Sequence, residues 1–133
     1  MKTLLMVKPD IVENGLFGEI IALVLRSRFK ITNLRMVHLD VGTVERFYEV
    51  HRGQEFYPSL VEYVSSGPVV AMEITGDNVI AAIRTLVGET DPGVARPGTI
   101  RHMFGISIQR NAVHASDSPE SAKKELAIVF GGS

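Results

Sequence analysis

Cysteine is absent from this sequence of 133 residues. The chain can therefore form no disulfide, offers no thiolate to zinc and has no thiol nucleophile, so covalent chemistry must use another side chain. No apolar run approaches the ~20 residues of a membrane span, and the N-terminus lacks the basic-then-apolar pattern of a secretion signal. We therefore expect a soluble, cytoplasmic protein.

A large excess of charge is also absent, since 14 Lys and Arg oppose 15 Asp and Glu. This balance argues against a surface that binds long nucleic acids by charge alone, so any anion site must be local. A chain of this length buries roughly two thirds of its unfolded surface. We expect one domain over residues 1–133 with a core that needs no cross-links.

Apolar spacing predicts alternating strands and helices. Strands are expected at 4–7, 30–39, 69–74 and around Ile106 and Ile108, and helices at 16–28, 43–50, 59–65, 79–87 and 118–130. This order is that of two split βαβ units, which predicts a ferredoxin-like α+β fold: a four-stranded antiparallel sheet covered by helices. Residues 88–101 form a long connection rich in Gly and Pro, typical of functional or mobile loops.

Among four histidines, His114 has the most informative surroundings, because it lies between a predicted strand and a helix capped by Ser118. A neutral imidazole, with a reference pKa of ~6.5, is a nucleophile at neutral pH without a separate base, so a phosphohistidine is accessible. The other three, His38, His51 and His102, have contexts typical of packed, surface, loop or helix-end residues.

A histidine that attacks phosphorus through one ring nitrogen needs a fixed acceptor for the other. Glu125, on the following helix, suits that task, and Ser116 could orient the pair. An exposed helix carboxylate and a turn or cap hydroxyl are the alternatives for these two residues. A metal site at His114 and Asp117 is disfavoured because no second ligand cluster accompanies them.

Positive side chains that would neutralise a transferring phosphate occur at a strand end, a helix end and the long connection. They are Lys8, Arg84 and Arg101. Each alone is also typical of a solvated charge, and Arg84 suits a helix C-terminus. Neither glycine-rich phosphate-binding loop motif is present, so side chains must bind any phosphate.

Several neutral side chains could complete a nucleotide site. Phe56 could stack on a nucleobase or form a hydrophobic staple at a helix start. Thr90 and Asn111 could bond to phosphate or ribose, although Thr90 also suits a turn. Tyr48 fits either the core or the site.

Five segments carry a resemblance to a known family. They are Lys8-Pro9-Asp10, Ser66-Gly67-Pro68-Val69, Gly88-Glu89-Thr90, Pro97-Gly98-Thr99-Ile100-Arg101 and Asn111-Ala112-Val113-His114-Ala115-Ser116-Asp117. In order and spacing they closely resemble the nucleoside diphosphate kinase family, over residues 3–130.

The resemblance implies ping-pong transfer of the terminal phosphate of a nucleoside triphosphate such as ATP to a nucleoside diphosphate, with broad base and sugar specificity. His114 would be the phosphorylated nucleophile, supported by Glu125, Ser116 and Tyr48. Magnesium would arrive on the nucleotide phosphates, with no protein side chain as its ligand. The nucleotide-binding residues would be Lys8, Phe56, Arg84, Thr90, Arg101 and Asn111.

Some positions depart from the family pattern. Ile11 stands where a small residue is usual, which affects packing of the first turn, and His102-Met103 follow Arg101 where a small residue and often an acid are common. Relatives often continue beyond Gly131-Gly132-Ser133 with a tail that makes subunit contacts. A homo-oligomer is expected, with tetramer, hexamer and dimer left open.

Two other function classes remain at this point. Ferredoxin-like sheets also carry RNA-binding aromatics on their strands, although this sequence lacks that strand motif. A nucleotide-sensing relative without catalysis is the other alternative, although every residue that the family chemistry needs is present.

Overall fold

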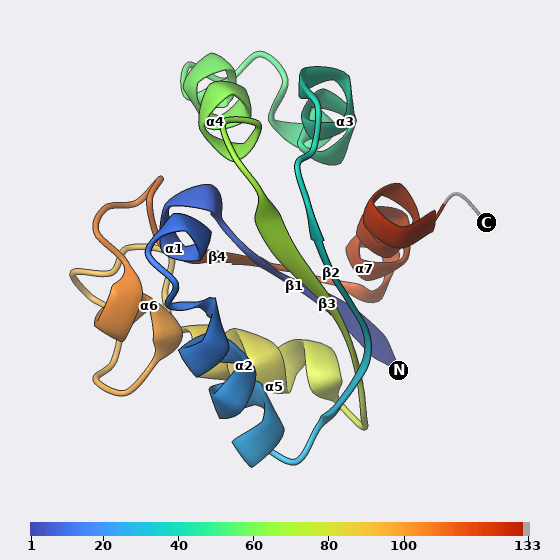
Figure 1. Ribbon diagram of the computed structural model, residues 1–133, viewed down its shortest axis with the longest axis vertical. Coiled ribbons are helices and arrows are strands. Elements are labelled where there is room, and N and C mark those ends of the chain that lie inside the picture. The colour runs from blue at the N-terminus through green and yellow to red at the C-terminus, as the bar shows by residue number, and fades with distance from the viewer. Residues whose placement is uncertain (132–133) are drawn as a thin grey trace.

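The strands form one antiparallel sheet in the order β2-β3-β1-β4 (Figure 1). In the computed structural model, which describes residues 1–131, the strands are β1 (Lys2–Val7), β2 (Lys30–Val37), β3 (Val69–Thr75) and β4 (Val113–Ala115). This order, with every neighbouring pair antiparallel, is the ferredoxin-like arrangement expected from the sequence.

Helices connect the strands and cover the sheet. They are α1 (Pro9–Glu13), α2 (Phe17–Arg26), α3 (Val41–Phe47), α4 (Tyr57–Val64), α5 (Val79–Val87), α6 (Ile100–Phe104) and α7 (Pro119–Leu126), with a 3-10 turn η1 (Glu49–His51) and a π-helical turn η2 (Ala127–Gly131). Within residues 1–131, no helix has both the length and the apolar character that crossing a membrane requires.

The core has two layers, one on each face of the sheet. Leu5 and Val7 pack with α1, α2 and α5, whereas Leu4 and Met6 pack with α3, α4 and η2. All four side chains are fully buried. The short apolar run at the start of the chain is therefore a central strand enclosed on both faces, which explains why it lacks the alternation of a half-exposed strand.

The fourth strand is not where the sequence predicted it. Ile106 and Ile108 lie in an irregular loop and are 73% and 62% exposed. The strand is β4, which pairs with β1 through only three residues. Because two alternating β-branched residues also occur on exposed loops, and three residues are too few for a pattern, the prediction was wrong. His114 consequently lies within a strand, not after one.

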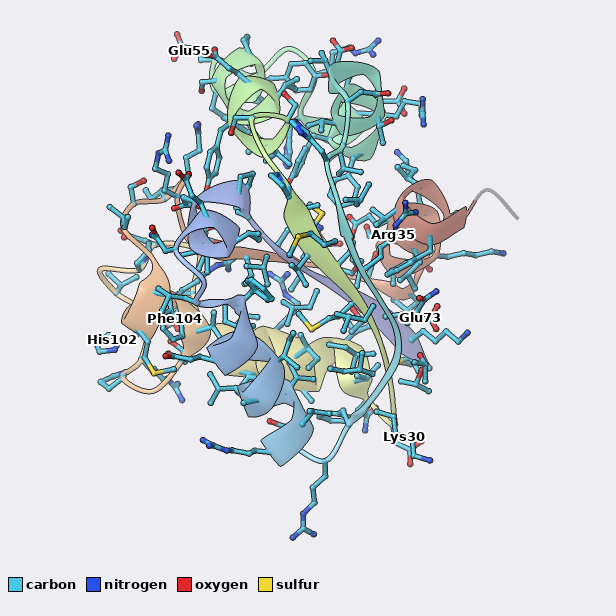
Figure 2. The ribbon with its side chains drawn as sticks, viewed as in Figure 1. Lys30, Arg35, Glu55, Glu73, His102 and Phe104 are labelled. Atoms are coloured by element: carbon cyan, nitrogen blue, oxygen red, sulfur yellow. The ribbon has the colours of Figure 1, made fainter. Side chains whose placement is uncertain are left out.

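The long connection is also shorter than expected, because α6 ends it. Thr99 accepts a hydrogen bond from the backbone N–H of His102 and so caps α6. Arg101, predicted on the loop, lies in the first turn of this helix. His102 is exposed and projects outward from α6 (Figure 2), and Met103 is 44% exposed.

The last helix begins as predicted. Ser118 accepts a hydrogen bond from the backbone N–H of Ser121, and Pro119 is the first helical residue. The helical path continues from α7 through η2 to Gly131, so the expected end near residue 130 is confirmed. Gly132 and Ser133, in the expected tail region, lie outside the described residues.

Pairing between β1 and β4 places the candidate nucleophile. Met6 is the register partner of His114, and side chains opposite each other in an antiparallel pair project from the same face. His114 therefore shares the face of Leu4 and Met6, which α7 and η2 cover. The two-residue period of β1 places Lys8, just after the strand, on the same side.

Gly88, just after α5, packs closely against Thr99, the cap of α6. Its backbone has φ +90° and ψ 179°, a conformation essentially restricted to glycine, and an added Cβ would lie 2.6 Å from the Thr99 hydroxyl. We expect Gly88→Ala to lower the free energy of unfolding by about 1–3 kcal/mol, measured by urea denaturation. As a control, Gly18→Ala, in helix α2 with open space around it, should raise that free energy by about 0.5–1 kcal/mol. Equal stability of the two variants would contradict this account.

Candidate active site

A cleft of about 410 Å³ lies beside β4 and is lined by residues from several separate elements. It gathers every predicted nucleotide-binding residue together with Tyr48 and His114: Lys8, Tyr48, Phe56, Arg84, Thr90, Arg101, Asn111 and His114. A larger hollow of about 630 Å³ between α1 and the end of α4 contains Asp10 and Tyr63 but no histidine. We therefore take the smaller cleft as the candidate active site.

His114 is held by a carboxylate on α7. Its Nε2 lies 2.9 Å from Glu125 Oε1, and both side chains are largely shielded, at 21% and 12% exposure. An ionised carboxylate can only accept hydrogen bonds, so Nε2 carries the proton and donates it to Glu125. This tautomer leaves the lone pair of the imidazole on Nδ1.

Ser116 connects this pair to the central strand. Its hydroxyl donates to Glu125 Oε1 at 2.7 Å and accepts from the backbone N–H of Leu4 at 3.3 Å. Glu125 is 9% exposed and Ser116 is fully buried. The alternatives of an exposed helix carboxylate and a cap hydroxyl therefore do not describe these residues; the cap of α7 is Ser118. Neither Glu125 nor Ser116 lines the cleft, because both lie behind His114.

Aromatic rings enclose the imidazole. Phe47 and Tyr48 present their edges or faces to His114 at near-perpendicular angles, with ring centroids 4.8 and 5.6 Å away. Burial, and then the charge of Glu125, raises the pKa of the Tyr48 hydroxyl. That hydroxyl has no hydrogen-bond partner within the described chain although Tyr48 lines the cleft. An unsatisfied buried donor is costly, so it is poised to bond to a ligand.

Lys8 is a buried cation at the end of β1. Its Nζ donates to Asn111 Oδ1 at 2.8 Å and to the backbone carbonyl of Gln109 at 3.1 Å. Only 5% of the residue is exposed. Burial, and then the charge of Arg101, lowers the pKa of Lys8 to about 7. Both effects penalise the charged form, and a bound anion would oppose them.

Two arginines extend the positive charge. Arg101 donates to the carbonyls of Gly88 and Val113, each at 3.1 Å, and burial followed by the charge of Arg84 lowers its pKa to about 10. Arg84 donates to the carbonyl of Ala115 at 3.2 Å. Among the described residues, neither arginine nor Lys8 forms a salt bridge. The cleft therefore concentrates three cations, none of which is in salt-bridge contact with a carboxylate of the described chain, and this favours binding of an anion.

The remaining predicted residues occupy the rim. Asn111 is buried and donates through Nδ2 to the carbonyl of Thr90 at 3.1 Å, which ties the two together. Phe56 immediately precedes α4 and is 45% exposed, with its ring 5.2 Å from that of His51. So much exposed aromatic surface favours stacking on a ligand over a staple that packs into the core.

The cleft also contains residues that the sequence did not single out for the site. They are His51, Leu60, Ile108, Gln109, Val113, Ala115 and Asp117. His51 was interpreted as a loop or helix-end residue. Ile108 was assigned to a strand, so its exposure in the cleft was not predicted. Asp117 was considered as a metal ligand and as the last residue of the motif around His114, but was given no role in nucleotide binding; hydrogen bonding to Ser121 is the main cause that lowers its pKa. Its position three residues after His114 was the one sequence signal that could have placed Asp117 in the cleft.

Two features bear on the alternatives. The four strands contain no Phe, Tyr or Trp, and the central strands are covered on both faces, so no aromatic sheet surface is available to RNA. No cluster of three or more His, Cys, Asp or Glu suited to a metal occurs among residues 1–131.

Comparison with known proteins decides the family. The sequence model described as nucleoside diphosphate kinase matches residues 1–133. The chain belongs to this family. It is 48% identical over 129 residues to a nucleoside diphosphate kinase of Archaeoglobus fulgidus, covering 97% of this chain and 85% of the relative. A nucleoside diphosphate kinase of Pelotomaculum thermopropionicum is 49% identical, with 97% and 87% covered.

Solved structures agree. A nucleoside diphosphate kinase of Aquifex aeolicus superimposes with a TM-score of 0.95 and 42% identity, covering 98% of this chain and 95% of that one. The protein is therefore a nucleotide-binding phosphotransferase of the nucleoside diphosphate kinase family. Of the departures from the family pattern, Ile11 is 2% exposed and belongs to the core beneath α1.

The low pKa of Lys8 predicts proton uptake on nucleotide binding. With a pKa of about 7, Lys8 should be mostly neutral at pH 8 in the empty site, and nearby phosphate charge should raise that pKa again. Binding of MgADP should then take up most of a proton, and affinity should fall by up to about tenfold per pH unit above 7. Calorimetry in buffers of different ionisation enthalpy measures the uptake. Lys8→Arg, which stays charged, should show none; equal uptake by the variant would contradict the prediction.

Proposed function

We propose that this protein transfers the terminal phosphate of a nucleoside triphosphate to a nucleoside diphosphate through a phosphohistidine at His114. The observation that carries the proposal is an imidazole fixed by a buried carboxylate inside a cleft of unpaired cations. The Nε2 of His114 is hydrogen-bonded to Glu125, and no hydrogen bond to its Nδ1 occurs within residues 1–131. We assign Nδ1 as the attacking atom.

The transfer is a ping-pong exchange of two balanced steps. The Nδ1 lone pair forms a bond to the terminal phosphorus, while the bond from phosphorus to the bridging oxygen breaks and the nucleoside diphosphate leaves with that electron pair. A terminal oxygen of the second diphosphate then attacks phosphorus, and the P–N bond returns its pair to Nδ1. Nε2 keeps its proton throughout, and Glu125 stabilises the positive charge that the ring gains on phosphorylation.

The cations hold the phosphates and spread the charge of the transition state. In this proposal Lys8, Arg84 and Arg101 contact phosphate oxygens, and the free hydroxyl of Tyr48 donates to the transferring group or its leaving oxygen. Ser116 acts through Glu125. Because these groups are fixed by backbone carbonyls and by Asn111, they need little rearrangement when the nucleotide binds.

The nucleoside would lie at the rim of the cleft. Phe56 would stack on the base, and Thr90 and Asn111 would bond to ribose or phosphate. A stacking contact uses the ring face, which all bases share, so it does not distinguish them by their donors and acceptors. We therefore propose broad base and sugar specificity.

Magnesium fits this cleft as a nucleotide complex. Its preferred ligands are oxygens, which the nucleotide phosphates supply, whereas the charged side chains of the described residues that line the cleft are three cations and a single carboxylate, Asp117. Bound Mg²⁺ would neutralise phosphate charge and polarise the terminal phosphorus. In this proposal Lys8, Arg84 and Arg101 orient the remaining phosphate oxygens. The cytoplasmic location expected from the sequence stays a prediction.

Intact mass spectrometry tests the proposal directly. After incubation with MgATP, the wild-type protein should gain one phosphoryl group, and added GDP, CDP, UDP or dADP should each remove it. His114→Ala should gain no phosphoryl group yet still bind MgADP. Glu125→Gln, which retains an acceptor without the charge, should phosphorylate more slowly.

Two outcomes would count against this function. A folded wild-type protein that binds MgATP but never gains the mass would be a nucleotide sensor without catalysis. Equal phosphorylation of His114→Ala would place the nucleophile elsewhere.

We also propose that the chain forms a homo-oligomer, either a dimer or a larger tetramer or hexamer. Strand β2 is at one edge of the sheet, and its Leu34 and Met36, which project from one face, are 49% and 54% exposed. An edge strand with exposed apolar side chains can pair with another copy.

Light scattering coupled to size exclusion checks the oligomer. The wild type should have a multiple of the 14.6 kDa chain mass, and Met36→Lys should reduce it. Val50→Lys, at a 78% exposed position on η1, is the matched control and should leave the mass unchanged. A monomeric wild type, or loss of assembly in the control alone, would contradict a β2 interface.

A further inference from the structure

A hydrogen bond crosses the outer end of the cleft. The side-chain hydroxyl of Ser59, in the first turn of α4, lies 2.9 Å from Gln109 Oε1 in the loop that precedes β4. Gln109 lines the cleft. The two residues are 50 positions apart in sequence, so this contact joins two walls that the chain does not otherwise connect locally.

The same hydroxyl is linked to the residue proposed to stack on the base. Ser59 Oγ lies 3.1 Å from the carbonyl of Phe56. A hydroxyl has one proton, but it can donate to Phe56 and accept from a side-chain amide. With the Gln109 amide turned so that its NH₂ group faces Ser59, both bonds form at once. With Oε1 facing Ser59 instead, the single proton serves the Gln109 bond and the Phe56 carbonyl at the longer distance is left without it.

Gln109 also has a contact with the phosphate half of the cleft. Its backbone carbonyl accepts from Lys8 Nζ at 3.1 Å. Its neighbour Ile108 has a side chain that is 62% exposed and also lines the cleft. One residue therefore fixes the loop at Lys8 through its main chain and at α4 through its side chain.

A second contact joins the same loop to α4 farther from the base. The guanidinium of Arg110 lies 4.5 Å from the centre of the Tyr63 ring, and Tyr63 is on the last turn of α4. We expect this stacking to remain when the Ser59–Gln109 bond is removed, because it uses different side chains. Loss of that bond should therefore loosen the rim without releasing the whole loop.

We propose that Gln109, through Ser59, is a positioning residue that sets the spacing between Phe56 and the 108–109 loop and thereby tightens binding of the nucleoside. This inference rests on the proposed function only in placing the base beside Phe56. In this proposal, the space between Phe56 and the 108–109 loop binds the base of a nucleoside di- or triphosphate.

Binding measurements test the role of the Ser59–Gln109 hydrogen bond without requiring phosphotransfer. We compare MgADP with magnesium ribose 5′-diphosphate, which lacks the base, by calorimetry on the wild type, Ser59→Ala, Gln109→Ala and the double variant. Each single variant should weaken MgADP binding about three- to tenfold, the range of one partly exposed hydrogen bond. Because the two changes remove the same bond, the double variant should bind no more weakly than the weaker single variant.

Two controls separate positioning from general damage. Ser59→Thr keeps the hydroxyl and should restore wild-type affinity. Ser27→Ala removes a hydroxyl bonded to a helix carbonyl far from the cleft and should change nothing. Thermal melting verifies that each variant folds. If Gln109→Ala does not fold, the binding of MgADP by Ser59→Ala alone tests the proposal.

The ligand without a base distinguishes the outcomes. Its affinity should be the same in all variants, and kcat with saturating ADP should stay within about twofold of wild type while the KM for ADP rises in parallel with the dissociation constant. Unchanged MgADP affinity, additive losses in the double variant, or equal weakening of the base-free ligand would each overturn the proposal. Failure of wild type to form a phosphohistidine would instead refute the proposed function and leave these binding results interpretable.

Discussion

The hydrogen bond from His114 to Glu125 joins the shortest strand of the sheet to the last helix, and the orientation of the site depends on it. Burial of an ionised carboxylate is costly unless every strong donor nearby is used. Here one carboxylate oxygen accepts from both the imidazole and Ser116. The ring is thus fixed in one tautomer before any ligand arrives, and its other nitrogen is left with a lone pair.

The cations around this ring form no salt bridge within residues 1–131, and the lack of a neutralising partner destabilises them. Lys8, Arg84 and Arg101 repel one another, and burial removes much of the hydration that would screen them; the lowered pKa values of Lys8 and Arg101 express that cost. Carbonyl oxygens supply partial compensation, since they satisfy the donors without cancelling the charge. The fold thereby maintains an unneutralised positive cleft that a polyphosphate can stabilise.

Much of this arrangement could be predicted from the sequence, for identifiable reasons. The apolar periodicity of α2 and α5 and the Ser118 cap of α7 are local signals, and the order of elements then indicated the sheet type. The motif around His114 indicated its partners through family resemblance, whereas spacing alone left Glu125 ambiguous. Strand β4 could not be found, because its three residues are specified by pairing with β1. The exposure of Ile108 and the contact between Ser59 and Gln109 depend on tertiary packing, which no local pattern reports.

Ser116 accepts a hydrogen bond from the backbone of Leu4, in the middle of the central strand. This contact ties the support of the nucleophile to a fully buried strand, and we expect the Leu4 amide to exchange slowly with solvent because exchange requires this part of the sheet to open. A fluctuation that detaches α7 would remove Glu125 from both Ser116 and the imidazole and so release the ring. The orientation of the nucleophile therefore depends on the docking of α7, and a state in which α7 has opened has no oriented imidazole.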